Sequence, residues 1–173
     1  MSVAGETTYS TQGRTAQKFA FEPVPSKDWE AKINGDKFEI RAKQEPGSIP
    51  YINGAFEILD SAAVDGGKNR VIFKMFFLSL KPGKDGNVSP DRADGILGMA
   101  RSLGIDAEFD ILSKNDKDGV PVFYLNPKTV LQWIKDNSGA VVRLHSKVVS
   151  QKGADGKPNG ERKAEVDYFI AAE

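Results

Sequence analysis

The longest apolar run of the chain, Val71 to Leu80, constrains the fold more than any other feature. Lys74 interrupts the run, which has about half of the roughly 20 residues that a membrane-spanning helix needs. Gly66-Gly67 precedes it and Pro82-Gly83 follows it, and glycine and proline both favour turns. A short apolar run between two turns predicts a β-strand over about residues 69–80.

The composition indicates one soluble domain and excludes several kinds of active site. A chain of 173 residues with 39% hydrophobic and 28% charged residues has the make-up of a globular domain. It contains no cysteine and one histidine, so thiol nucleophiles, disulfides and zinc sites built from these residues are excluded. Lys and Arg together number 24, as do Asp and Glu, so there is no net charge to attract a polyanion. Any nucleic-acid binding must depend on local charge.

The N-terminal region differs from the rest of the chain. Residues 1–20 are polar and lack apolar periodicity, which predicts a flexible arm followed by a single folded domain over 21–173. The arm lacks the basic and apolar regions of a secretory signal, and no apolar run is long enough to span a membrane. We therefore expect a cytoplasmic protein with no membrane partner.

Alternation of apolar and polar residues predicts strands on both sides of the middle of the chain. Before the central strand, the alternation covers 29–43, with a bend at Asn34-Gly35-Asp36, and 51–60. Near the C-terminus it covers 142–147 and 164–170. The apolar face predicted for the last strand consists of Ala164, Val166, Tyr168 and Ile170.

An insertion with helices is predicted between the third and fourth strands. Ser89-Pro90 and Asn126-Pro127 each place a capping residue before a proline in a first helical turn, and Gly104 ends the first helix. A short hairpin over 109–125 separates the helices, and Pro121 favours an edge position for its second strand. The predicted fold is thus mainly β with a helical insertion. Its order is that of a five-stranded OB-fold barrel, with two helices and a short hairpin between strands 3 and 4.

This pattern resembles small phage-encoded single-stranded DNA-binding proteins of replication and recombination gene clusters. The segments that carry the resemblance are Trp29–Arg41, Ile58-Leu59, Arg70–Leu78, Ile96–Gly104 and Ala164–Phe169. The resemblance implies binding and protection of single-stranded DNA in the cytoplasm of the host, with little sequence specificity and without a cofactor. It leaves replication or recombination proteins and a second copy of the chain open as further partners.

Catalytic and metal-binding motifs give no support to an enzyme. The loop around Asp116 and Asp118 imitates the spacing of a calcium loop, but Lys114 occupies the first ligand position and Leu125 the last. Gly67-Lys68 lacks the surrounding residues of a phosphate-binding P-loop. We therefore expect a protein that is not an enzyme and holds no metal.

Binding of single strands without sequence preference requires aromatic rings for base stacking and cations for phosphates. In the central strand, Lys74 and Phe76 share one parity, whereas Phe73 and Phe77 share the other. Only one of the two parities can face the interior of a barrel. Because Lys74 is charged, we predict that the residues of its parity face outward. This assigns Phe73 and Phe77 to the core and makes Phe76 a candidate stacking platform.

The complete candidate site combines two aromatic rings with six cations. Tyr51 is the second platform, and the predicted phosphate contacts are Arg41, Lys43, Arg70, Lys74, Arg143 and Lys147. Each residue also has an ordinary structural interpretation: Phe76 as part of a second core, Tyr51 as a loop anchor, and the cations as solvated surface charges. The alternative function is a protein-interaction module in which Phe76 and Tyr51 are hydrophobic anchors.

Overall fold

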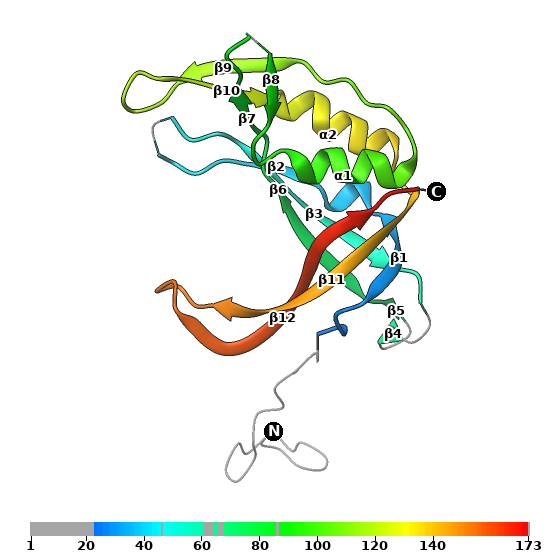
Figure 1. The fold of residues 1–173 in the computed structure, drawn as a ribbon. Helices are drawn as coiled ribbons and strands as arrows, with labels where there is room; N and C mark the ends of the chain where they lie inside the picture. The colour runs from blue at the N-terminus through cyan, green and yellow to red at the C-terminus, as the bar shows by residue number, and fades with distance from the viewer. Residues whose placement is uncertain (1–22, 46, 61–63, 66–67, 86, 173) are drawn as a thin grey trace, which may run out of the picture.

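A computed structural model describes residues 23–45, 47–60, 64–65, 68–85 and 87–172 (Figure 1). The predicted arm over 1–20 and the Gly66-Gly67 turn lie outside these residues. The elements are β1 (Asp28–Ile33), the 3-10 turn η1 (Gly35–Lys37), β2 (Glu39–Arg41), β3 (Tyr51–Ile58), β4 (Val64–Asp65), β5 (Lys68–Asn69), β6 (Val71–Phe76), β7 (Ser79–Pro82), β8 (Val88–Pro90), α1 (Asp94–Leu103), β9 (Ile111–Asn115), β10 (Pro121–Leu125), α2 (Pro127–Asp136), β11 (Val141–Lys152) and β12 (Pro158–Ile170).

Five strands form a nearly closed sheet. Its pairing order is β1-β11-β12-β6-β3, and β3 pairs again with β1. The pairings are antiparallel except that of β12 with β6, which run parallel and meet at Glu165 and Phe73. β2 continues the sheet beyond β3, after the bend at η1. The prediction of a mainly β fold is confirmed.

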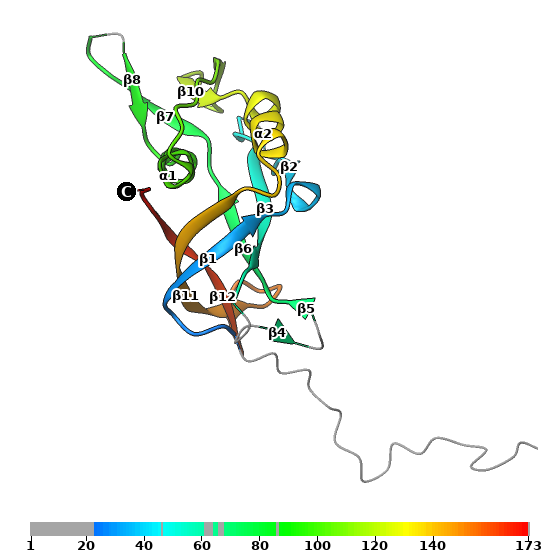
Figure 2. The ribbon, with the colours of Figure 1, turned by 90° about the vertical axis from the view of Figure 1, so that its right-hand side faces the viewer.

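The insertion between β6 and β11 lies at one end of this sheet, as both ribbon views show (Figures 1 and 2). It holds α1, α2 and a second sheet of order β8-β7-β10-β9, so the predicted two helices and hairpin are confirmed. Pro121 was wrongly expected to confine its strand to an edge. β10 lies between β7 and β9, and Pro121 is tolerated there because it opens the strand, whereas pairing with β7 involves Phe123 and Tyr124.

Two of the three predicted helix boundaries follow their local signals. Gly104 ends α1 in the left-handed conformation at φ 69°, which glycine adopts without steric cost. The Asn126 side chain accepts a hydrogen bond from the Lys128 amide and begins α2. The predicted start at Ser89-Pro90 is wrong, since these residues belong to β8 and α1 begins at Asp94.

The interior of the five-stranded sheet contains a cluster of aromatic rings. Phe76 is 1% exposed and stacks on Phe169, with 6.0 Å between ring centroids and 14° between ring planes. It also lies 6.2 Å from each of the Phe38 and Phe56 ring centroids. Phe76 is therefore a core residue, and its prediction as an exposed stacking platform is wrong.

The parity of β6 is the reverse of the predicted one. Phe73 is 56% exposed, whereas Ile72 and Phe76 point inward. Lys74 belongs to the inward row of Ile72 and Phe76, and its side chain fits there because a hollow lies between this part of β6, β12 and α1. A Cβ at Gly95 in α1 would lie 3.1 Å from Lys74 Cε, so the absence of a side chain there gives the lysine stem its path. The lysine stem therefore lies in this hollow, although the residue belongs to the inward-facing row of β6.

A bulge reverses the face of β12 near its end. His145 pairs with Tyr168 and Ser146 with Val166, so Asp167 is an extra residue between two pairs. Val166 is consequently buried, whereas Tyr168 is 51% exposed. The prediction that both residues share one apolar face is wrong, because a single inserted residue changes the side-chain parity.

Candidate nucleic-acid interface

An exposed apolar row runs along the outer face of β6. Val71, Phe73 and Met75 are 42%, 56% and 44% exposed, and we call these three residues the outer row. They alternate with the inward-facing Ile72 and Lys74, as the pleat of a strand requires. Across the sheet they lie opposite Glu57, Ala55 and Asn53 of β3.

A cluster of two aromatic rings and one arginine lies just beyond the end of β6. The Tyr51 and Phe77 ring centroids are 6.1 Å apart with their planes tilted by 43°. The Arg92 guanidinium carbon lies 3.8 Å from the Phe77 ring centroid, which is a cation–π contact. We call Tyr51, Phe77 and Arg92 the aromatic–arginine cluster.

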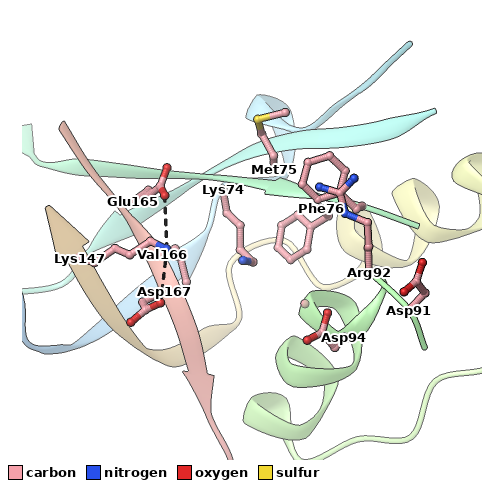
Figure 3. Close-up of a pocket in the computed structure, with 12 residues that line it drawn as sticks. Lys74, Met75, Phe76, Asp91, Arg92, Asp94, Lys147, Glu165, Val166 and Asp167 are labelled. Atoms are coloured by element: carbon pink, nitrogen blue, oxygen red, sulfur yellow. Dashed lines mark ion pairs between the residues drawn. The ribbon is translucent and has the colours of Figure 1, made fainter. Parts of the chain in front are cut away.

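Two hollows adjoin this cluster, and Phe77 and Arg92 line both of them. The first, of about 390 Å³, lies between β6, the start of α1 and β12 (Figure 3). We call it the β6–β12 hollow. The second, of about 280 Å³, lies against residues 43, 45 and 47–51 and is called the Tyr51 hollow. The cluster therefore separates two depressions of one surface.

The β6–β12 hollow carries charges of both signs. Its cations are Lys74, Arg92 and Lys147, and its carboxylates are Asp91, Asp94, Glu165 and Asp167. Several of these charges are already paired. Lys147 Nζ lies 3.7 Å from Glu165 Oε1 and 3.5 Å from Asp167 Oδ1 (Figure 3), and Asp91 pairs with Lys81 at 3.5 Å.

Lys74 is the half-buried cation of this hollow. Burial lowers its pKa and the Lys147 ammonium lowers it further, whereas the carboxylates of Asp94, Glu165 and Asp167 act in the opposite direction. Its Nζ lies 5.6 Å from the Phe76 ring centroid. Among the described residues, no carboxylate lies within 4.0 Å of this ammonium. An anion entering the hollow would therefore meet a cation that is short of a partner.

Five of the eight predicted site residues line the two hollows, and one of the five, Phe76, does so as a buried core residue. Lys43 and Tyr51 line the Tyr51 hollow, and Lys74 and Lys147 line the β6–β12 hollow. Lys43 does so from beyond the end of β2, so the prediction that it continues the first strand is wrong.

The remaining predicted residues are placed differently. Arg41 is exposed, lies opposite Tyr51 across β2 and β3, and pairs with Glu39. Arg70 is half-buried immediately before β6. Arg143 lies on β11, opposite Glu30 of β1, and lines neither hollow, so it is separated from the other cations.

Sequence reasoning missed Phe73, Met75, Phe77 and Arg92 as surface residues. The first three follow from the reversed parity of β6. Arg92 was assigned to the helix predicted from Ser89-Pro90 onward, whereas it precedes α1. Its position next to an aromatic ring depends on how the segment before α1 packs against β7 and the end of β6, which no local sequence signal indicates.

A second aromatic pair lies on a different part of the sheet. His145 of β11 stacks on Tyr168 of β12, with ring centroids 4.9 Å apart, and its Nδ1 lies 2.7 Å from Asp28 Oδ1. This pair is the natural comparison for the outer row, because Tyr168 is nearly as exposed as Phe73.

Two general observations complete the description. In the part of the chain that the structure describes, the helices are too short and too polar to cross a membrane. Comparisons of the chain with models of protein families, with curated proteins and with solved structures found no match.

Proposed function

We propose that this chain is an OB-fold protein that binds single-stranded DNA with little sequence preference, through the outer face of β3 and β6. Counting β1 with β2 as the first strand, the large sheet has five strands, and its helical insertion follows the third. In OB-folds, the face of strands 2 and 3 and the adjoining loops bind oligonucleotides. In this chain those strands are β3 and β6.

The exposed ring of Phe73 is the observation that carries the proposal. An aromatic ring on an open sheet face accepts any base by stacking, because every base has a π-face. Met75 and Val71 extend the apolar row on either side, and the aromatic–arginine cluster follows at one end. The row and the cluster together form an aromatic surface suited to successive bases.

The charges around this surface favour a moderate electrostatic contribution to the free energy of DNA binding. Lys43, Lys74, Arg92 and Lys147 lie beside it, but Lys147 is already paired with two carboxylates. A phosphate near Lys147 would therefore exchange one anionic partner for another, which yields little free energy at a solvent-exposed site. We infer that stacking supplies much of the affinity. The role implied by the resemblance is protection of single strands during phage replication or recombination, in the host cytoplasm.

Fluorescence anisotropy of labelled oligo-dT and of a matched duplex tests the proposal. The single strand should bind and the duplex should bind much more weakly. Between about 50 and 200 mM salt, the logarithm of the affinity should fall with a slope of about −0.7 for each phosphate neutralised. Absence of oligo-dT binding at the lower salt concentration would refute the proposal.

A protein-binding surface is the second candidate function, and the outer row favours it. Three neighbouring exposed apolar side chains are also what a protein partner from a replication complex would cover. The equal numbers of cationic and acidic residues suit such a partner. Salt dependence separates the two functions, because an apolar protein contact releases few counterions.

Lys74→Met should make the folded protein more stable at pH 7 and weaken its binding to oligo-dT. The folded-state pKa of Lys74 lies below the value of 10.5 for the unfolded chain, so the fold disfavours the ammonium at every pH below both values. This cost disappears as the pH rises through the lowered pKa, and the stability advantage of the variant should shrink as the pH approaches 10.5. The salt slope of binding should fall by about 0.7 if Lys74 contacts one phosphate.

Urea unfolding at pH 7 and at pH 10 measures the stability difference, and anisotropy measures the salt slope. Lys128→Met, at an exposed position on α2, is the matched control and should change neither quantity. A Lys74→Met protein that is less stable than the wild type at pH 7 contradicts this account of Lys74.

A further inference from the structure

The segment before α1 is held in a position that directs Arg92 onto Phe77. The backbone amides of Asp91 and Arg92 both donate to the Ser79 carbonyl, at 3.3 and 3.1 Å. The Asp91 carboxylate pairs in addition with Lys81 of β7. These contacts fix the backbone that leads into the arginine Cα, so the cation–π contact of 3.8 Å is supported by its surroundings.

The Arg92 guanidinium is stacked and still able to donate hydrogen bonds. Among the described residues, no carboxylate lies within 4.0 Å of it. A guanidinium that lies against a ring keeps its N–H groups in its own plane, where they can reach a phosphate. Arg92 thus offers a cation to an anion that passes over Phe77.

The aromatic–arginine cluster continues the outer row toward the insertion. Phe77 follows Phe73 by four residues, or about 13 Å of extended chain. This distance corresponds to at most about four phosphate spacings of a B-form strand. Beyond Phe77 lie Tyr51 and the Tyr51 hollow, with Lys43 on its border. Aromatic rings and cations therefore continue from the sheet onto a surface shared by residues 47–51, Lys43 and the segment before α1.

We propose that the aromatic–arginine cluster is a second nucleotide subsite, in which Tyr51 stacks a base and Arg92, held over Phe77, binds its phosphate. The inference rests on the proposed function and specifies the path of the DNA. A single strand that lies on the outer row continues across Phe77 toward Lys43. Short oligonucleotides occupy the outer row alone, whereas longer ones occupy both subsites.

The dependence of affinity on oligonucleotide length tests this inference. OB-folds cover about 4–16 nucleotides, so an oligo-dT of about 15 nucleotides can reach both subsites. An oligo-dT of about 3 nucleotides has fewer phosphate spacings than the roughly four that separate Phe73 from Phe77. In Arg92→Gln and in Tyr51→Leu, affinity for the long oligonucleotide should fall about 5- to 150-fold, the equivalent of one lost base stack. Affinity for the short oligonucleotide should stay within about twofold of the wild type.

Controls on exposed residues outside the cluster make the result specific. Arg101→Gln on α1 and Tyr168→Leu on β12 remove the same side-chain types and should leave both affinities unchanged. Arg92 is exposed, so its variant tests the inference even if Tyr51→Leu lowers folding stability. The thermal midpoint of each variant shows whether its fold is intact.

The outcomes separate the inference from the function on which it rests. If the wild type binds both oligonucleotides and the cluster variants lose nothing, or lose equally for short and long DNA, the second subsite is refuted while the proposed function stands. If the wild type binds neither oligonucleotide, the proposed function is refuted together with the subsite.

Discussion

Replacing Phe76 with alanine will lower the free energy of unfolding by about 3–5 kcal/mol. The ring is 1% exposed and lies about 6 Å from the Phe38, Phe56 and Phe169 ring centroids, so its removal leaves a cavity that these three rings cannot fill without moving. Urea unfolding followed by circular dichroism measures the loss.

Phe73→Ala is the matched control for this experiment, since it removes the same side chain three residues earlier. Phe73 is 56% exposed, and surface substitutions commonly change stability by less than about 0.5 kcal/mol. If Phe73→Ala proves the more destabilising of the two, the inward parity assigned to β6 is incorrect.

Phe73→Ala will instead weaken binding to oligo-dT by about 1–3 kcal/mol, which corresponds to about 5- to 150-fold in affinity. The loss should be similar for different base sequences, because a stacking platform does not read hydrogen-bonding edges. The salt slope should stay close to that of the wild type, because no cation is removed.

Tyr168→Ala is the control for the binding experiment, because it removes an exposed ring from another part of the sheet. It should leave the affinity unchanged. Equal losses from the two substitutions would place the DNA on a wider surface than the outer face of β3 and β6.

The order of the elements could be predicted because each has a local signal. Alternating residues predicted β3, β11 and the body of β12, and the Asn126-Pro127 pair predicted the start of α2. Gly104 ended α1 where the sequence indicated, since a left-handed residue there favours glycine. Such signals depend on a few neighbouring residues, so they act in the same way whatever the tertiary structure around them.

The faces of two strands could not be predicted, because they depend on contacts between distant segments. Both parities of β6 are apolar, and Lys74 was taken to mark the outer one. Its side chain can face inward because a hollow lies between β6 and β12 there and because Gly95 has no side chain to block the lysine stem. The bulge at Asp167 likewise arises from pairing with β11 and has no counterpart in the alternation of residues 164–170.

These errors exchanged the roles of phenylalanines within one segment of the candidate site, residues 73–77. The predicted platform Phe76 is buried, but its neighbours Phe73 and Phe77 lie on the opposite, outward parity of the same segment. Besides Phe76, four predicted residues line the two hollows: Lys43, Tyr51, Lys74 and Lys147. The predicted strand order was enough to bring these segments near one another. The pairing register is needed to tell which side chains of each strand face outward.

Photocrosslinking of an oligo-dT that carries 5-iodouracil, followed by mass spectrometry of the linked peptides, tests the central claim most directly. Iodouracil links to aromatic side chains on which it stacks. If the outer face of β3 and β6 binds single strands, the linked residues will be Phe73, Phe77 or Tyr51. Crosslinks confined to Tyr168 and His145 would contradict this account and place the DNA on β11 and β12.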